Sequence, residues 1–485
     1  MKNGFFKYIA FSGLLLLLCP ALVIAQDDTA KTVVVETAAA AEEIVPGASC
    51  AVPETVEEIT EATLNSGNTA WLIVATILVM MMTIPGLALF YGGLVRQKNI
   101  LSILMQCLII TAVISIEWII VGYTWVFGTG FMPDENGGGG SVLGAFIGGF
   151  DKIFLHGITL NSLTGDIPEL VFVLFQCMFA VITPALIIGA FAERIKFSGF
   201  LLFTILWALL VYNPMAHWVW GGGWMQQMGA IDFAGGTVVH INAGISALMM
   251  ALLLGRRKGY LTTGHPITPH NIPFVVIGTA LLWLGWFGFN AGSGLAANGQ
   301  AANAFLVTHL ATAVAAVTWT VLEWIINKKP TVVGICTGAV AGLVAITPAA
   351  GTVDAMGAFF IGLATGTVCY VMVAYVKPKL TYDDSLDAFG VHGVGGFIGA
   401  ILTGVFATQF VTADYNNEIG ALYGNWEQLW IQVKVNFAAV AYSAILTFIL
   451  FKTVDKVIGL RVSKEEESVG LDISQHGEIA YSEDE

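Results

Sequence analysis

Residues 168–192 read PELVFVLFQCMFAVITPALIIGAFA, a run of 25 positions in which Glu169 is the only charged residue. At a rise of about 1.5 Å per residue, a helix of this length spans the roughly 30 Å hydrocarbon core of a bilayer. A helix also satisfies its own backbone polar groups, which lipid cannot do. The stretch therefore predicts a transmembrane helix.

Ten further apolar runs lie on either side of this stretch. Some are short or interrupted by glycine, so their boundaries are soft. Together they predict an all-α polytopic membrane protein with eleven transmembrane helices. The runs cover about residues 68–91, 100–127, 168–192, 198–216, 236–255, 272–291, 302–326, 332–347, 355–376, 390–409 and 430–451.

The composition of the 485-residue chain supports this class. Hydrophobic residues make up 56% of the chain, charged residues only 11%, and the mean hydropathy is +0.78. A soluble domain carries about 25% charged residues. Too few polar side chains remain to cover a soluble globule of this size, which excludes a soluble enzyme.

The net charge of −14 is concentrated at the two ends of the chain. Residues 26–65 hold nine acidic residues and one lysine, and residues 461–485 hold eight acidic and two basic residues. We interpret 26–66 as an external acidic tail, 67–460 as the membrane domain and 461–485 as a cytoplasmic C-terminal tail. This acidity disfavours a nucleic-acid partner.

Residues 1–25 have the pattern of a secretory signal peptide. Lys2 and Lys7 precede an apolar run, and small residues precede a polar stretch. A lipoprotein signal at Cys19 is the weaker alternative, because Leu18 stands where a small residue is expected. Of the 18 basic residues that remain after residue 25, 15 lie on the same predicted side of the membrane as the C-terminus. The positive-inside rule then predicts a multi-pass protein of the cell (inner) membrane, with the N-terminus outside and the C-terminus cytoplasmic.

Eleven helices divide into two inverted five-helix repeats and a long final helix, and such repeats place a substrate path at the midplane. GTVVH at 236–240 and GVH at 390–392 occupy the same position in each half. His240 and His392 are therefore candidate pore residues, although each alone is more often a packing histidine. A zinc site would need a third ligand that no accompanying motif supplies. We expect no metal and no other cofactor.

Three other ionisable residues fall inside the predicted helices. Glu117 has no partner visible in the sequence, His309 is better explained by packing, and Glu323 lies near lysines and is interpreted as an interface anchor. Four of the six cysteines lie in apolar runs and are expected to be buried small hydrophobic residues. Cys50 has no assigned role.

Aromatic residues gather near the predicted outer ends of several helices. Phe175 and Phe179 lie in the third run, three tryptophans flank the glycines at 221–223, and WFGFNAGS at 286–293 ends the sixth run. An interfacial aromatic belt explains several of these residues. A cage for a small polyatomic cation is the alternative, since each cation–π contact contributes about 0.5–2 kcal/mol.

Four stretches, in chain order, resemble signature motifs of the ammonium transporter/methylammonium permease/Rhesus family. They read TIPGLALFYGGL (83–94), DFAGGTVVHIN (232–242), GWFGFNAGS (285–293) and FGVHGV (389–394). The resemblance runs from about residue 68 to the C-terminus. Trp220 and Ser293 make the chain similar to the ammonium-transporter branch, because Rhesus-type members lack this tryptophan and serine.

This resemblance implies a homotrimer in which each protomer transports ammonium through its own narrow hydrophobic pore. It implies no catalytic residues. An outer site would bind NH4+ and a gate would follow it. Because desolvating a unit charge in an apolar pore is costly, we expect deprotonation near the gate and passage of NH3. The implied residues are Trp220, Phe179 and Ser293 at the outer site, Phe179 and Phe289 at the gate, His240 and His392 in the pore, and Asp232 and Thr237 as supports.

The C-terminal tail resembles the family segment that couples neighbouring protomers and meets PII-type regulators. An ammonium sensor with little transport is the alternative function, but no signalling domain follows the tail and both pore histidines are present. An intramembrane enzyme is disfavoured, because the sequence offers no nucleophile–base set.

Overall fold

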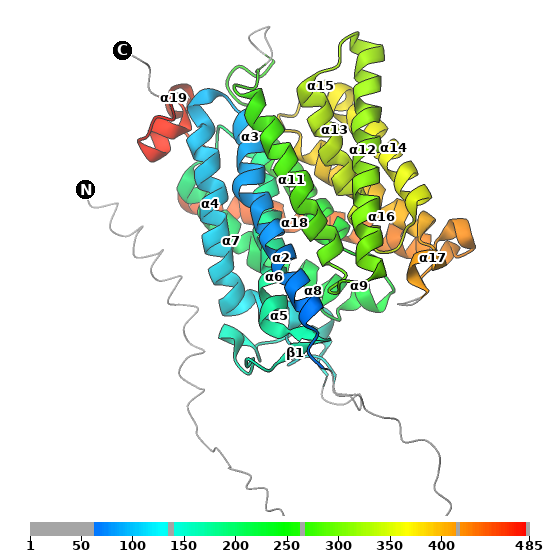
Figure 1. The fold of residues 1–485 in the computed structure, drawn as a ribbon. Coiled ribbons are helices and arrows are strands. Elements are labelled where there is room, and N and C mark those ends of the chain that lie inside the picture. Colours follow the sequence, from blue (N-terminus) through cyan, green and yellow to red (C-terminus); the bar gives the residue numbers. More distant parts are fainter. Residues whose placement is uncertain (1–62, 134–139, 262–266, 414–417, 482–485) are drawn as a thin grey trace, which may run out of the picture. The chain divides into compact units, whose positions relative to one another are not determined.

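The computed structural model describes residues 63–133, 140–261, 267–413 and 418–481 (Figure 1). The predicted signal peptide, most of the predicted external tail, Cys19 and Cys50 lie outside these residues. The elements described below belong to one compact unit, Thr60–Glu485.

Ten helical segments within the described residues are long and apolar enough to cross a membrane. Each coincides with one of the predicted runs. They are Ser66–Leu94, Gln97–Phe127, Glu169–Phe191, Phe197–Gln227, Gly236–Leu254, Ile272–Gly292, Gly299–Asn327, Ala355–Leu380, Phe389–Phe406 and Trp426–Ile458.

The remaining predicted run, 332–347, forms a shorter helix. This helix, α13 (Val332–Ile346), has 15 residues, fewer than the roughly 17 that a membrane span usually needs. The Thr331 hydroxyl accepts a hydrogen bond from the Gly334 N–H at 2.9 Å and so begins α13. The count of long apolar helices is therefore ten, with α13 as a shorter apolar helix at the eighth position.

Several of the long segments combine α-helix with short π-helical turns. The first half contains α2 (Ser66–Met81), α3 (Ala88–Leu94), α4 (Ile100–Glu117), α5 (Tyr123–Phe127), α6 (Glu169–Phe191), α7 (Phe197–Trp207), α8 (Asn213–Trp220), α9 (Trp224–Gln227) and α10 (Asn242–Leu254). Its π-helical turns are Met82–Leu87, Trp118–Gly122, Ala208–Tyr212 and Gly236–Ile241.

The second half continues the same pattern. It contains α11 (Ile272–Gly292), α12 (Gly299–Asn327), α13, α14 (Ala355–Val371), α15 (Lys377–Leu380), α16 (Val394–Phe406), α17 (Gln409–Thr412), the 33-residue α18 (Trp426–Ile458) and α19 (Lys464–Val469). Its π-helical turns are Met372–Val376, Phe389–Gly393 and Asp472–His476.

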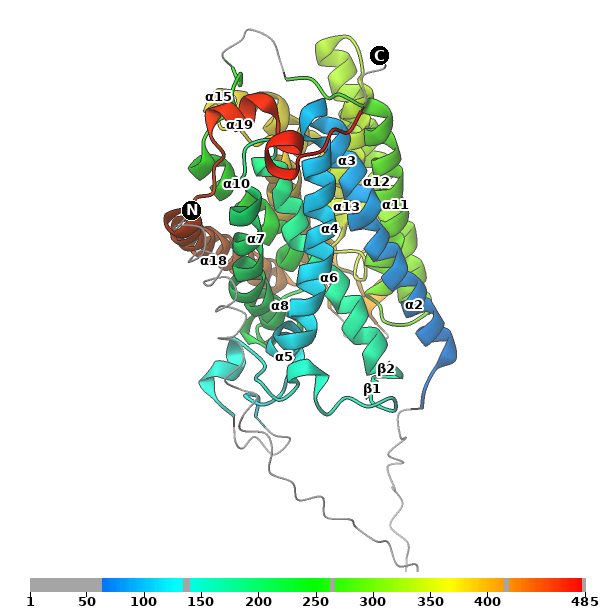
Figure 2. The ribbon, with the colours of Figure 1, turned by 90° about the vertical axis from the view of Figure 1, so that its left-hand side faces the viewer.

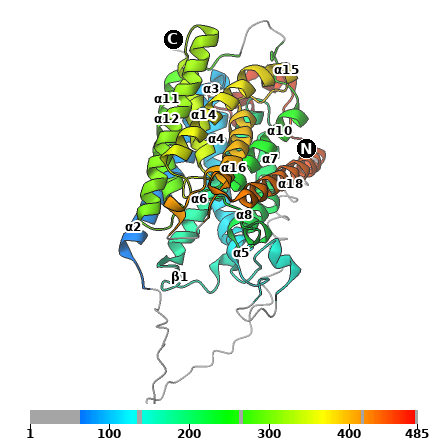
Figure 3. The ribbon, with the colours of Figure 1, turned by 90° about the vertical axis from the view of Figure 1, so that its right-hand side faces the viewer.

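The prediction of an all-α fold holds except for one small hairpin. Strands β1 (Leu163–Thr164) and β2 (Ile167–Pro168) pair antiparallel directly before α6. The hairpin, α5 and α9 lie at one end of the helix bundle, and α15 and α19 lie at the other end (Figures 1 and 2). The long helix α18 runs obliquely across α7, α10 and α16 (Figures 2 and 3).

Glycine allows the helices to approach closely around α12. A Cβ atom at Gly342 of α13 would lie 2.7 Å from the Ala311 carbonyl oxygen, and one at Gly366 of α14 would lie 2.8 Å from that of Ala315. Both distances are too short for a side chain. These glycines therefore bring α13 and α14 against the backbone of α12, which is the usual means of helix contact in lipid.

The four cysteines of the predicted helices are confirmed as buried residues. Cys107, Cys177, Cys336 and Cys369 are free thiols with at most 6% of their surface exposed. They pack as small hydrophobic residues.

Candidate functional site

A pocket of about 200 Å³ opens among the ends of α5, α6, α8 and α11. Three of the residues around it are those predicted for the outer site: Phe179 from α6, Trp220 at the end of α8, and Ser293 directly after α11. Three segments far apart in the sequence thus meet here. The lining consists of Phe127, Phe172, Gln176, Phe179, Val219, Trp220, Gln226, Phe233, Ser293 and Leu295.

The Trp220 indole is held in place by Asp232. Its Nε1–H donates to the Asp232 backbone carbonyl at 2.9 Å. Trp220 also makes an edge-to-face contact with Phe179, with ring centroids 5.8 Å apart. The π-face of Trp220 is therefore fixed at the pocket, where an aromatic ring attracts a small cation.

The Asp232 carboxylate caps the N-terminal end of the helical segment that contains His240. It accepts four backbone hydrogen bonds, from Gly235 and Gly236 on one oxygen at 2.9 and 2.6 Å, and from Thr237 and Val238 on the other at 2.8 and 3.1 Å. These N–H groups are the orphan donors of a helix start. Asp232 thus supports the pocket by its backbone and the helix by its side chain.

Thr237 connects the same helix start to the final long helix. Its hydroxyl donates to the Asn436 side-chain oxygen of α18 at 2.8 Å. Both residues are buried, with 1% of the surface exposed. This bond fixes the first turn of the segment against α18.

Below the pocket, Phe179 and Phe289 lie ring against ring. Their centroids are 4.4 Å apart at an interplanar angle of 38°. Phe179 is 1% exposed and Phe289 is fully buried. The two rings separate the pocket from His240, whose ring lies 6.1 Å beyond Phe289.

His240 and His392 form a pair of imidazoles inside the bundle. Their Nδ1 atoms are 3.4 Å apart, and their exposed fractions are 1% and 4%. Trp286 stacks on His240 at 5.4 Å, and its indole N–H donates to Thr347 at 2.8 Å. Trp286 is thus a neighbour of the pair that the sequence analysis named only within a motif.

Only one proton fits between the two Nδ1 atoms. One neutral ring must donate and the other accept, so the pair presents one Nε2–H donor and one bare Nε2 acceptor to its surroundings. The Nε2 atom of His240 is buried and has no hydrogen-bond partner among the described residues. A small molecule that both donates and accepts hydrogen bonds can interact with such a pair.

Asp384 is a residue of this arrangement that the sequence analysis missed. It precedes His392 by eight residues, as Asp232 precedes His240. Its carboxylate accepts from the N–H groups of Ala388 and Phe389 at 3.1 and 2.8 Å and so begins the second histidine segment. Burial, together with the Asp387 carboxylate, raises the pKa of Asp384 to about 7. The equal spacing was the signal that could have found it.

A glycine follows each histidine by four residues and lets the two segments cross. A Cβ atom at Gly396 would lie 2.8 Å from the His240 Cβ, and one at Gly244 would meet the Gly393 backbone. Accordingly α16 packs on the turn that holds His240, and α10 packs on the turn that holds His392. The two halves contact each other reciprocally at the histidines.

The other intramembrane residues do not join this site. The Asn213 amide donates to Glu117 at 2.7 Å, which supplies the partner that the sequence did not reveal. His309 is exposed, and its ring centroid lies 5.3 Å from that of Trp283. Glu323 accepts from Thr331 at 2.8 Å and so supports the start of α13.

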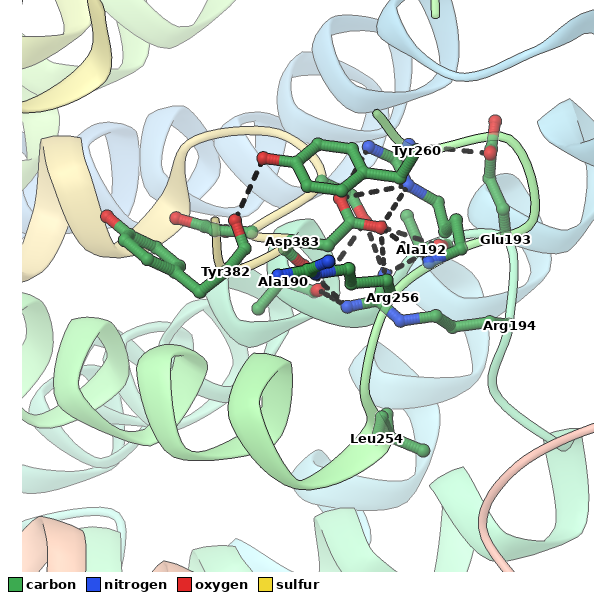
Figure 4. A network of polar contacts seen from close by, with 12 residues as sticks. Ala190, Ala192, Glu193, Arg194, Leu254, Arg256, Tyr260, Tyr382 and Asp383 are labelled. Carbon is green, nitrogen blue, oxygen red and sulfur yellow. Dashed lines mark hydrogen bonds and ion pairs between the residues drawn. The ribbon is translucent and has the colours of Figure 1, made fainter. Parts of the chain in front are cut away.

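A network of buried ion pairs (Figure 4) lies at the end of the bundle where α15 and α19 lie (Figure 1). Arg257 binds Asp383 at 2.8 Å and Glu193 at 3.4 Å, and Arg96 binds Glu193 at 2.6 Å. Burial alone would raise the pKa values of both carboxyl groups, but the guanidinium groups outweigh it and hold both below their ordinary values. Arg194 donates to the Asp383 backbone carbonyl at 2.6 Å. The network joins the segments after α6, α10 and α15.

The C-terminal segment docks on this same end. Arg461 pairs with Glu467 at 3.1 Å, and Glu467 accepts from the Lys258 N–H at 2.5 Å. Asp472 accepts from the Ser102 N–H at 2.9 Å, and the Leu471 N–H donates to Asn99 at 2.9 Å. The C-terminal tail thus contacts the start of α4 and the loop after α10.

Comparisons with known proteins agree on one family. The model of the Ammonium Transporter Family matches residues 70–481. The "Ammonium transporter" of Aquifex aeolicus (strain VF5) is 52% identical over 424 residues, covering 87% of this chain and 95% of that relative. The crystal structure of Saccharomyces cerevisiae Mep2 has a TM-score of 0.75 at 36% identity, covering 83% of this chain and 89% of that one. A structure titled "Sensor Amt Protein" has a TM-score of 0.75 at 32% identity, covering 84% and 98%.

Proposed function

The chain belongs to the ammonium transporter family, and from this premise we propose that it carries ammonium across the cell membrane through a twin-histidine pore. One observation supports the route above all others. The aromatic pocket, the Phe179–Phe289 stack and the His240–His392 pair follow one another through ring contacts of 4.4, 6.1 and 5.4 Å. No enzymatic step is part of the proposal.

NH4+ binds first at the outer pocket. Trp220 and Phe179 offer aromatic surfaces, and Ser293 offers a hydroxyl whose own proton is donated to the Phe289 carbonyl at 2.8 Å. The Ser293 oxygen can therefore accept a hydrogen bond from NH4+ while the rings contribute about 0.5–2 kcal/mol per cation–π contact. Potassium cannot donate such a bond, which favours ammonium.

The cation loses a proton near the stacked phenylalanines, and this proton either passes along the His240–His392 pair or remains on the outer side, two routes that differ in the current they carry. Taking a unit charge into an apolar passage costs far more than a few contacts return. NH3 avoids this cost, and it can exchange hydrogen bonds with the one donor and one acceptor that the histidine pair presents. The low charge of the membrane segments suits a neutral passenger better than a cation.

We also propose that α13 is the eighth of eleven transmembrane helices. The chain would then consist of two inverted five-helix repeats followed by α18. The matching aspartate–histidine–glycine spacings, Asp232–His240–Gly244 and Asp384–His392–Gly396, support this symmetry. The N-terminus would be outside and the C-terminus cytoplasmic, in a homotrimer. The docked tail would couple protomers and offer a surface to a PII-type regulator.

The decisive experiment measures ammonium-driven current and ammonia flux in proteoliposomes. The wild type is compared with the double variant His240→Ala plus His392→Ala, at equal protein density. Loss of flux or of ammonium selectivity in the variant supports the pore assignment. Unchanged flux and current would overturn the role of the histidines.

An ammonium sensor is the second candidate, because one structural relative is titled "Sensor Amt Protein". The same reconstitution separates the two functions. Saturable ammonium binding to the wild type without measurable flux would favour sensing. Flux that saturates over the concentrations at which binding saturates would favour transport.

A further inference from the structure

Gln176 is a polar residue in the middle of the apolar helix α6. Two other polar side chains of this helix have partners. Glu169 accepts from Lys152 at 2.6 Å, and the Thr183 hydroxyl donates to a backbone carbonyl at 2.6 Å. The Gln176 amide has no hydrogen-bond partner among the described residues. An unpaired amide in a membrane helix costs free energy, which a bound polar molecule can offset.

The Gln176 side chain borders the outer pocket. Phe172 and Phe179, four residues before it and three residues after it, border the same pocket. The three residues therefore share one face of α6, as this spacing requires in a helix. Gln176 is partly buried, so its amide meets the contents of the pocket.

Gln176 and Ser293 occupy matching positions beside the stacked phenylalanines. Gln176 precedes Phe179 by three residues in α6, and Ser293 follows Phe289 by four residues at the end of α11. At a rise of about 1.5 Å per residue, each polar residue lies roughly one helical turn from its phenylalanine. The two rings touch, with centroids 4.4 Å apart, and both polar residues line the pocket. Two helices thus each bring one polar side chain to the pocket side of the stack.

The third amide or hydroxyl side chain of the lining, Gln226, is already engaged. Its Oε1 accepts from the Gly222 N–H at 2.7 Å, and the residue is exposed. The other lining side chains are aromatic or aliphatic, and the Trp220 indole N–H is used by the Asp232 carbonyl. Within the described lining, Gln176 and Ser293 are therefore the side chains with an oxygen available to a ligand.

These two oxygens can bind one cation together. The pocket of about 200 Å³ has room for only several water molecules of about 30 Å³ each, so a cation inside it lies close to both side chains. The Gln176 Oε1 is an amide acceptor, and the Ser293 oxygen accepts because its own proton goes to the Phe289 carbonyl. We propose that Gln176 is a second cation-binding residue of the outer pocket, and that Gln176 and Ser293 together select cations with at least two N–H groups. This role rests on the proposed function of the pocket.

The number of N–H groups on a cation decides how much of this pair it can use. NH4+ has four and methylammonium has three, so either ion can donate to both oxygens and turn its remaining groups toward the aromatic rings. Trimethylammonium has a single N–H and can donate to only one oxygen. Hydrogen bonds from a charged donor are the strong ones, so the second bond should dominate the difference that Gln176 makes.

The test is a binding cycle of two ligands and two proteins. Wild type and Gln176→Leu, in lipid nanodiscs at neutral pH, are titrated calorimetrically with methylammonium chloride and with trimethylammonium chloride. Leucine has a similar volume but no acceptor. We expect Gln176→Leu to weaken methylammonium binding about tenfold and trimethylammonium binding less than threefold, because only methylammonium loses a hydrogen bond. Equal weakening of both ligands, or no weakening of methylammonium, would overturn the proposal.

Two further variants separate binding from a disturbance of α6. Gln176→Glu keeps the acceptor oxygens, so it should bind methylammonium at least as tightly as the wild type. Methylammonium binding as weak as that of Gln176→Leu would show that the amide only packs, which would overturn the proposal. Gln409→Leu is the matched control with unchanged binding, because Gln409 is exposed and lies outside the pocket.

Ammonium flux in proteoliposomes distinguishes this role from the proposed function. We expect Gln176→Leu to raise the half-saturating ammonium concentration about tenfold, with a smaller change in maximal rate. An unchanged half-saturating concentration would refute the role of Gln176 in transport. Absence of flux in the wild type would refute the proposed function instead, and the binding cycle would still decide whether Gln176 and Ser293 act as a pair.

Discussion

The indole N–H of Trp220 donates to the backbone carbonyl of Asp232 at 2.9 Å, while the Asp232 side chain holds four N–H groups at the start of the segment that carries His240. A single residue therefore connects the aromatic pocket with the helical segment that carries His240. A substitution at Asp232 should therefore affect both the pocket and the segment that carries His240.

Asp232→Ala should lower both stability and transport. It removes a carboxylate that satisfies four buried donors, and the loss of a helix cap alone costs about 0.5–2 kcal/mol. Thermal unfolding in detergent and flux in proteoliposomes measure the two effects. Asp354→Ala is the control, because Asp354 caps α14 through one bond to Gly357 at 2.9 Å, away from the pocket. If both variants lose stability equally and neither loses flux, Asp232 is only a helix cap.

Trp220→Leu should weaken apparent ammonium affinity by about 2- to 30-fold, the equivalent of a cation–π contribution of about 0.5–2 kcal/mol. Trp220→Phe should lie between, because it keeps an aromatic face but loses the bond to Asp232. The concentration dependence of ammonium current gives the affinity. Trp430→Leu is the control, since Trp430 is 62% exposed on the helix surface. An unaltered concentration dependence for Trp220→Leu would count against the aromatic site.

Gly396→Ala should disturb the histidine pair. The added methyl group would lie 2.8 Å from the His240 Cβ, and overpacking of this kind costs about 1–3 kcal/mol. We expect reduced flux and a lower unfolding temperature. Gly299→Ala is the control, because a Cβ atom there would meet nothing within 4 Å. Normal flux in Gly396→Ala would show that the crossing of the two segments tolerates more space than the structure indicates.

The ionic network should make stability depend on acid pH. The pKa values of Glu193 and Asp383 are lowered in the folded protein, so the unfolded chain takes up these protons first as pH falls. Their contribution is therefore complete above about pH 5 and is lost as pH falls through the lowered values, below about pH 4. Unfolding temperatures measured across this range should fall steeply in the wild type.

Asp383→Asn tests the same network at neutral pH. Removing one partner leaves Arg257 buried without its bidentate acceptor, which costs about 3–5 kcal/mol. Its unfolding temperature should be lower at neutral pH and fall less on acidification. Glu427→Gln, at an exposed position of α18, is the control. An equal acid dependence in Asp383→Asn and the wild type would place the titrating groups elsewhere.

The sequence predicted the helices well because membrane insertion depends on each segment's own residues. A run such as 168–192 enters lipid by the summed transfer free energies of its side chains, so the run coincides with Glu169–Phe191. The run 332–347 likewise coincides with α13 (Val332–Ile346), whose 15 residues are fewer than a membrane span usually needs.

The prediction of the site residues relied on different information. His240 and His392 were identified by repeat position, and the residues of the outer pocket by family resemblance, because no local pattern says which aromatic rings meet. Asp384 was missed although its spacing to His392 repeats that of Asp232 to His240. The spacing became meaningful only once both carboxylates were seen to bind the N–H groups at a helix start.

By itself the sequence determined which segments are apolar, where charge is excluded and which two histidines occupy equivalent positions. Only the tertiary structure decided that Trp220, Phe179 and Ser293 share one pocket, that Gln176 lines it as well, and which glycines are close contacts. The physical reason is that hydrophobicity is a sum over single residues, whereas a pocket or a hydrogen bond needs atoms from separate helices placed within a few ångströms by packing.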